Sequence, residues 1–160
     1  MKFTKIPAPD FDLEKTVNSG QVFHWQKVGD GFVGAIGDLA VYVEQRAGTL
    51  RVLMEGGAPA TPGGRRAKRL GSQELAPPVQ DLVAHYFALD HVLAEICDSF
   101  PKDPTMNAAQ EFCLGLRIIR QPKWECLATF ICSSMKQVAH IRQISLALRK
   151  RFGEIGRAHV

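Results

Sequence analysis

The first third of the chain alternates between short apolar runs and short polar segments rich in Gly or Asp. The runs are residues 22–25, 32–36, 39–43 and 50–54. Turn signals precede them, among them Ser19-Gly20 and Gly37-Asp38. Short β-rich runs at this spacing are typical of strands joined by tight turns. The pattern therefore predicts an antiparallel meander, with residues 22–25 as its first strand.

After Pro77 the apolar spacing changes to that of a helix. Val79, Leu82, Val83 and Tyr86 recur every three or four residues, which places them on one helical face. Further helices are predicted over residues 91–99, 108–114, 122–133 and 136–152. The residues that we expect on buried helical faces are Val92, Leu93 and Ile96, then Trp124, Leu127, Ala128 and Ile131. Trp25 is also expected in the core.

A meander followed by helices indicates the α+β class. We expect an antiparallel sheet domain with helices packed on one side, followed by the first helices of an all-α domain. Residues 56–72 interrupt the pattern with Gly, Pro, Ala and a basic cluster. This composition buries little apolar surface, so a loop is predicted there.

Charge is distributed unevenly along the chain. Residues 1–98 hold 10 Lys and Arg against 12 Asp and Glu, a net −2, whereas residues 99–160 hold 10 against 4, a net +6. A basic second half suits a polyanionic partner. Ordinary solubilising charge explains the same numbers equally well, so charge alone leaves both explanations open.

Other features exclude whole classes of protein. No apolar run reaches the length of about 18 residues that spans a membrane, and residues 1–7 have no apolar signal-peptide core. We therefore expect a cytoplasmic, nucleoid-associated or nuclear protein. Cys97, Cys113, Cys126 and Cys132 lack metal-ligand spacing, so they are expected to be reduced, buried thiols. We expect no metal and no cofactor.

Four motifs stand out in order along the chain. They are Ser19-Gly20-Gln21-Val22-Phe23-His24-Trp25, Tyr86 to Asp90, Arg120 to Leu127, and Phe130 to Ser134. With them the sequence resembles the 8-oxoguanine DNA glycosylase family over about residues 10–153. The resemblance implies a sheet domain like half of TATA-binding protein, assigned to residues 1–100. It also implies the start of a helix-hairpin-helix domain, assigned to residues 101–153.

The resemblance gives Gly20 the role of recognising the damaged base. The N7 atom of 8-oxoguanine carries a hydrogen where guanine has a lone pair, so a backbone carbonyl aimed at N7 attracts the lesion and repels guanine. Leaving that buried carbonyl without a donor costs on the order of 1–3 kcal/mol. Glycine also lets a backbone approach a flat base closely. The alternative is that Ser19-Gly20 is only a turn before a strand.

The junction between the last two predicted helices is the expected DNA contact. A helix start exposes N–H groups that suit a phosphate or a base edge. The predicted contacts are Ser134, Met135, Lys136, Gln137, His140 and Arg142. Many family members carry Asn in place of Met135 and Arg in place of His140, and both contact the orphaned cytosine. These departures leave the preferred opposite base open.

The resemblance also implies what the chain does not carry. Members of the family use a lysine nucleophile, which forms a Schiff base, and an assisting aspartate, both in the helix-hairpin-helix region. No segment here matches that motif, so we assign no catalytic residue in this chain. The parent protein is expected to be a glycosylase and lyase in base-excision repair of 8-oxoguanine, and this chain to be an inactive, C-terminally truncated part of it.

Two further expectations concern the partner and the end of the chain. Double-stranded DNA containing 8-oxoguanine is the expected partner, bound by a monomer. Residues 154–160 match one reading frame of a common sequencing-library adapter, and we hypothesise that they are not native. Two other functions stay open: a related glycosylase for alkylated bases, and a non-catalytic module that binds DNA or protein.

Overall fold

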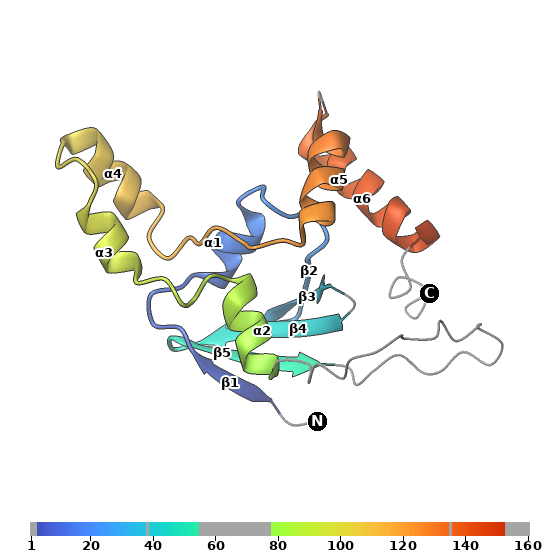
Figure 1. Ribbon diagram of the computed structural model, residues 1–160, viewed down its shortest axis with the longest axis horizontal. Coiled ribbons are helices and arrows are strands. Elements are labelled where there is room, and N and C mark those ends of the chain that lie inside the picture. Colours follow the sequence, from blue (N-terminus) through green and yellow to red (C-terminus); the bar gives the residue numbers. More distant parts are fainter. Residues whose placement is uncertain (1–2, 38, 55–77, 135, 153–160) are drawn as a thin grey trace, which may run out of the picture.

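The computed structural model describes residues 3–37, 39–54, 78–134 and 136–152. Its centre is a five-stranded antiparallel sheet with the strand order β1-β5-β4-β3-β2 (Figure 1). The strands are β1 (Thr4–Pro7), β2 (Gln26–Val28), β3 (Gly31–Ile36), β4 (Leu39–Arg46) and β5 (Thr49–Met54). Strands β2, β3, β4 and β5 follow one another along the chain and each pairs antiparallel with the next, as expected of a meander, and β1 adds an edge strand beside β5.

The core lies on one face of this sheet. Val43 pairs with Phe32 on one side and Val52 on the other, and all three side chains are buried. Two helices cover this face, α1 (Leu13–Asn18) and α2 (Val79–Tyr86), and α2 lies across the strands in Figure 1. Asp12 caps α1 by accepting a hydrogen bond from the Lys15 N–H at 2.8 Å, which satisfies one free donor of the first turn.

Four more helices follow. They are α3 (Leu93–Asp98), α4 (Pro104–Phe112), α5 (Lys123–Ser133) and α6 (Val138–Phe152). In Figure 1, α3 and α4 extend from one side of the molecule and α5 and α6 from the other. Residues 113–122, here called the crossing segment, run between α4 and α5 past α1. No helix in the described ranges is long and apolar enough to cross a bilayer.

The observed elements confirm the α+β class and most of the predicted strands and helices. The prediction of a strand at residues 22–25 is wrong, because the first strand of the meander begins at Gln26. The apolar side chains there serve the core instead. Trp25 is 9% exposed and its indole N–H donates to the Tyr86 hydroxyl at 3.1 Å. Helix α4 also begins earlier than predicted, because Asp103 caps it and Pro104 occupies its first turn.

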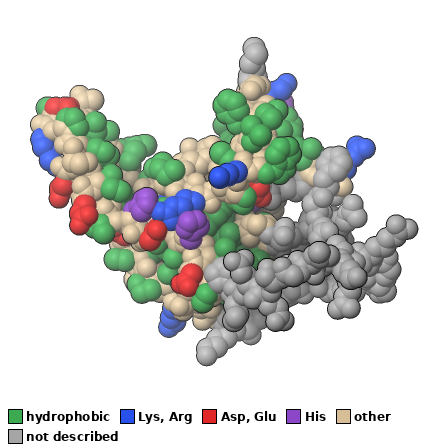
Figure 2. All heavy atoms as spheres, in the orientation of Figure 1, with side chains coloured by type: hydrophobic (Ala, Val, Ile, Leu, Met, Phe, Trp, Pro, Cys, Tyr) green, Lys and Arg blue, Asp and Glu red, His purple; other side chains and the backbone are tan. Residues whose placement is uncertain are grey.

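The predicted burial of the later helices is also wrong in part. Trp124 is 74% exposed, and Val92, Ile96, Leu127 and Ile131 are exposed too. Figure 2 shows hydrophobic side chains gathered over α5. Helical spacing collects apolar residues on one face, but burial also needs an element to cover that face. The four cysteines are free as expected, although Cys113 and Cys126 are exposed and Cys97 and Cys132 are only half-buried.

Two predicted features fall outside the described residues. They are the loop at 56–72 and the tail at 154–160.

Candidate functional site

Gly20 lies in a bend directly after α1, where the chain leaves the helix. Its φ is +88°, a left-handed conformation that costs an L-residue with a side chain roughly 1–2 kcal/mol. A methyl group at this position would meet nothing within 4 Å, so the backbone angle and not crowding calls for glycine here. Among the described residues, none donates a hydrogen bond to the Gly20 carbonyl oxygen.

The next residue, Gln21, is hydrogen-bonded to the crossing segment at three atoms. Its side-chain Nε2 donates to the Arg117 carbonyl at 2.9 Å, and its Oε1 accepts from the Ile119 N–H at 2.8 Å. Its own carbonyl oxygen accepts from Nε2 of Gln121 at 2.7 Å. The side-chain amide of Gln21 therefore pairs with the backbone of residues 117 and 119 as the backbone of a neighbouring strand would. The side-chain amide of Gln121 adds the third hydrogen bond, to the Gln21 carbonyl.

Arg117 anchors the crossing segment to the sheet domain. The residue is 3% exposed. Its Nη1 donates to the carbonyls of Ala88 at 3.1 Å and His91 at 2.7 Å, and its Nη2 pairs with Asp10 at 2.6 Å. Its backbone N–H donates to Oγ1 of the buried Thr16 in α1. The crossing segment is thus fixed to α1 and to the turn after α2.

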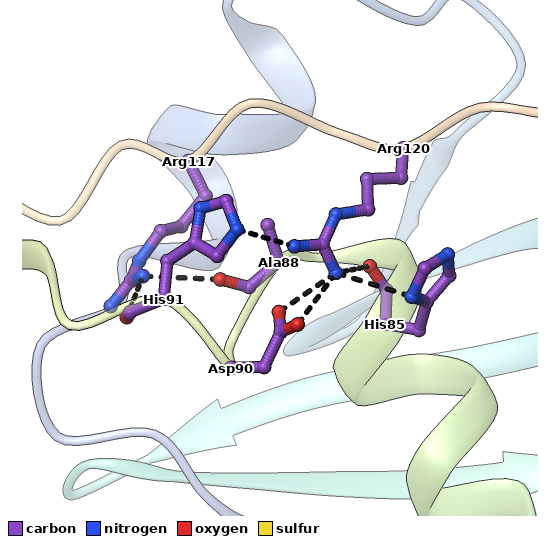
Figure 3. Close-up of polar contacts among 6 residues, drawn as sticks. All are labelled: His85, Ala88, Asp90, His91, Arg117 and Arg120. Atoms are coloured by element: carbon purple, nitrogen blue, oxygen red, sulfur yellow. Dashed lines mark hydrogen bonds and ion pairs between the residues drawn. The ribbon is translucent and has the colours of Figure 1, made fainter.

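Arg120 makes a second attachment three residues later. Its Nη1 donates to both carboxylate oxygens of Asp90, at 2.8 and 2.9 Å, and its Nη2 lies 2.6 Å from Nε2 of His91 (Figure 3). Nδ1 of His85, on α2, lies 3.1 Å from Nη1. The hydrogen bond from Arg120 lowers the pKa of Asp90 below its ordinary 3.8. Asp90 is therefore the ion-pair partner of Arg120.

The predicted DNA contacts lie around the junction of α5 and α6. Ser134 is the C-cap residue that follows α5, and Ser134, Lys136, Gln137 and His140 are all exposed. Met135 lies outside the described residues. The junction is closed by a hydrogen bond from the Lys136 N–H to the Ser133 carbonyl at 3.2 Å.

Arg142 has a different setting from the rest of that group. It lines a cavity of about 290 Å³ between α6 and the sheet domain. The other lining residues are Asn18, Phe23, Trp25, Gln26, Lys27, Phe32 and Leu146. Asn18 and Phe23 flank the Ser19-Gly20-Gln21 bend in sequence, so this cavity is lined by one predicted DNA contact and by the residues on either side of the predicted base-recognition element.

Comparison with known proteins relates this geometry to a family. The family model described as "8-oxoguanine DNA glycosylase, N-terminal domain" matches residues 4–127. The chain belongs to this family. An Arabidopsis thaliana N-glycosylase/DNA lyase OGG1 is 30% identical over 142 residues, which cover 88% of this chain and 35% of the relative.

Solved structures agree with the 8-oxoguanine DNA glycosylase assignment. MBOgg1 in complex with a low-affinity DNA ligand aligns with a TM-score of 0.73 at 28% identity, over 95% of this chain and 50% of its own. The apo form of the Clostridium acetobutylicum 8-oxoguanine glycosylase/lyase aligns with a TM-score of 0.69 at 18% identity, over 94% and 49%. The second likeness shows the fold alone. The chain spans about half the length of these solved relatives, and about a third of the Arabidopsis one.

Within this 8-oxoguanine glycosylase fold, the sequence indicated the bend at Gly20 but not the residues that hold it. Gln21 and Gln121 both lie in the recognised motifs, as do Asp90 and Arg120. The motifs, however, do not indicate which residues the side chains of Gln21 and Gln121 contact. Arg117 lies outside every motif. A buried arginine three residues before Arg120 has no signal in a single sequence, because its partners come from residues 10, 88 and 91.

Proposed function

We propose that this chain is the lesion-recognising part of a DNA N-glycosylase/AP lyase that removes 8-oxoguanine in base-excision repair. The partner is double-stranded DNA containing 8-oxoguanine, bound by a monomer in the cytoplasm at the nucleoid or in the nucleus. Enzymes of this class extrude the damaged nucleotide from the duplex before acting on it. The observation that carries the proposal is the exposed Gly20 bend, whose flanking residues Asn18 and Phe23 line one cavity together with Arg142, a predicted DNA contact.

The geometry at Gly20 suits a single-atom test of the base. Gly20 has a φ of +88° and an exposed backbone, so its carbonyl is available to an incoming hydrogen-bond donor. The N7–H of 8-oxoguanine is such a donor, whereas the lone pair of guanine N7 faces the carbonyl with repulsion. Once a bound base covers this carbonyl and excludes water from it, leaving it without a donor costs about 1–3 kcal/mol, so this atom alone gives roughly 5- to 150-fold discrimination.

Residues at the start of α6 are proposed to hold the DNA. Ser134, Lys136 and Gln137 are available to phosphate oxygens at the junction, and Met135 and His140 are proposed to face the base opposite the lesion. Phosphate contacts position a duplex, and base contacts specify it. Methionine lacks the amide of the asparagine, and histidine lacks the planar fork of the arginine, that many family members carry at these two positions. The preference for cytosine opposite the lesion should therefore be weak.

Binding of matched duplexes tests the proposal. Fluorescence anisotropy with 8-oxoguanine opposite cytosine, and with guanine in the same position, gives two dissociation constants at one salt concentration. We expect tighter binding to the damaged duplex, and loss of that preference in Gly20→Ala. Gly37→Ala is the control, because Gly37 also has a positive φ and open space around it but lies in the turn between β3 and β4.

The chemical step is proposed to depend on residues that this chain does not carry. Lys123 and Lys136 do not match the family's nucleophile motif, so borohydride should trap no covalent adduct with an 8-oxoguanine duplex. An adduct would refute this part of the proposal while leaving lesion recognition intact. A preference for alkylated purines over 8-oxoguanine would favour the related glycosylase, and equal affinity for all duplexes would favour a non-catalytic binding module.

A further inference from the structure

The hydrogen bonds around Gln21 place the base-recognition bend in register with the helical part of the chain. Gln21 follows Gly20 directly, and Gln121 directly precedes Pro122, the N-cap of α5. The 2.7 Å hydrogen bond from Nε2 of Gln121 to the Gln21 carbonyl therefore joins the bend to the start of α5. One side chain spans the distance between the predicted base-recognition element and the helix that leads to the predicted DNA contacts.

We infer that Gln21 and Gln121 are positioning residues for lesion recognition, which aim the Gly20 carbonyl by fixing the residue on its C-terminal side. This inference rests on the proposed function. The Gly20 carbonyl belongs to the peptide between Gly20 and Gln21, so its direction depends on the placement of the Gln21 Cα atom. Two groups of Gln21 hold that atom in place. Its side-chain amide is hydrogen-bonded to the backbone of residues 117 and 119, and its backbone carbonyl accepts from Gln121.

The crossing segment is itself held by buried contacts and hydrogen bonds, which is what positioning requires. Ile119, which donates to Gln21, is 6% exposed and belongs to the hydrophobic core. The Arg120 N–H donates to the Tyr86 carbonyl at 2.8 Å, and the Arg117 guanidinium is buried among three oxygen acceptors. The position of the crossing segment therefore determines the position of Gln21, and through it that of the bend. Among the described residues, none donates a hydrogen bond to the Gly20 carbonyl itself.

Gln121→Met gives the sharpest test, because methionine keeps the side-chain length and removes only the donor. Gln110→Met is the matched control. Gln110, in α4, is also half-buried, and its Nε2 donates one hydrogen bond, at 2.9 Å, to the backbone carbonyl of Cys97 in α3. Both variants lose one amide-to-carbonyl hydrogen bond of the same kind, but only one of these bonds touches the bend.

Two measurements on the whole chain separate the outcomes. One is the ratio of dissociation constants for the guanine and 8-oxoguanine duplexes. The other is the backbone order of Gly20 and Gln21 from ¹⁵N relaxation. Gln121→Met should lower the ratio at least roughly 5-fold, equivalent to one lost hydrogen bond, and reduce order at the bend. Affinity for the undamaged duplex should stay unchanged, and Gln110→Met should leave every value at that of the wild type.

Three results would overturn the inference. A wild-type preference for the lesion that survives Gln121→Met removes the inference alone and leaves the proposed function standing. Equal weakening toward both duplexes identifies Gln121 as a general stabilising residue. Absence of any preference in the wild type removes the proposed function and this inference together, whatever the relaxation data show.

Discussion

Replacing Arg117 with methionine should destabilise the fold far more than replacing an exposed cation does. Methionine keeps much of the apolar stem and removes the guanidinium. The Ala88 carbonyl then loses its donor in a buried setting, and the His91 carbonyl loses one in a partly buried setting. Unsatisfied buried acceptors cost about 1–3 kcal/mol each. Asp10 is 50% exposed, so water replaces most of what its carboxylate loses.

Counting the full cost for the buried Ala88 carbonyl and about half of it for the partly buried His91 carbonyl gives a loss of about 1.5–4.5 kcal/mol. The free energy of unfolding of a domain is typically about 5–15 kcal/mol. Urea unfolding measures the loss as a lower midpoint at an unchanged slope. Lys102→Met is the comparison, because its ion pair with Asp98 is 3.6 Å long and exposed at both ends; such pairs contribute at most about 1 kcal/mol. Equal effects of the two substitutions would refute the argument that Arg117 is the anchor of the crossing segment.

Three other predictions follow from single contacts. Gly34→Ala places a Cβ in collision with Cδ2 of the Trp25 ring, so it should cost roughly 1–3 kcal/mol and change tryptophan fluorescence; an unshifted spectrum would contradict it. Arg120 lowers the pKa of Asp90, so the stability that this carboxylate contributes is present above pH 3.8 and is lost as the pH falls through the lower folded value. NMR titration should show this depression disappearing in Arg120→Met, and an ordinary value in the wild type would refute it. Burial, followed by the hydrogen bond to Glu44, raises the pKa of Tyr42 above 10.0, so its contribution is present below pH 10.0 and is lost at higher pH; an absorbance titration compared with Tyr42→Phe measures the shift.

The strands of the meander were predictable because their signals are local. Turn residues and alternating apolar residues fix β3, β4 and β5 to within a few residues of the predicted limits. The segment 22–25 looked like a strand for the same reason. Its residues, however, make tertiary contacts and do not form a strand. Val22 and Trp25 pack in the core, and Nε2 of His24 lies 3.0 Å from the Ala35 carbonyl oxygen. Composition alone does not separate these two causes.

The candidate site was predictable only in part. Gly20 was identified through a motif, and its positive φ agrees with the need for glycine. The hydrogen bonds of Gln21 connect residues about 100 positions apart, and no local pattern encodes such a pairing. The exposed face of α5 shows the reverse case: its helical spacing was predicted correctly, yet Trp124 is exposed because burial depends on neighbours that periodicity does not specify.

The way in which the crossing segment joins the sheet domain has a consequence for recognition. Apolar packing is non-directional and tolerates small shifts between surfaces, whereas hydrogen bonds weaken steeply when their geometry changes. The crossing segment combines one buried apolar residue, Ile119, with directional contacts from Arg117, Arg120 and Gln121. Two surfaces joined in this way have one favoured register. The proposed recognition of 8-oxoguanine by the Gly20 carbonyl depends on one hydrogen and requires that carbonyl to be held in a defined position. A polar and directional junction at the neighbouring Gln21 is the arrangement that this proposal needs.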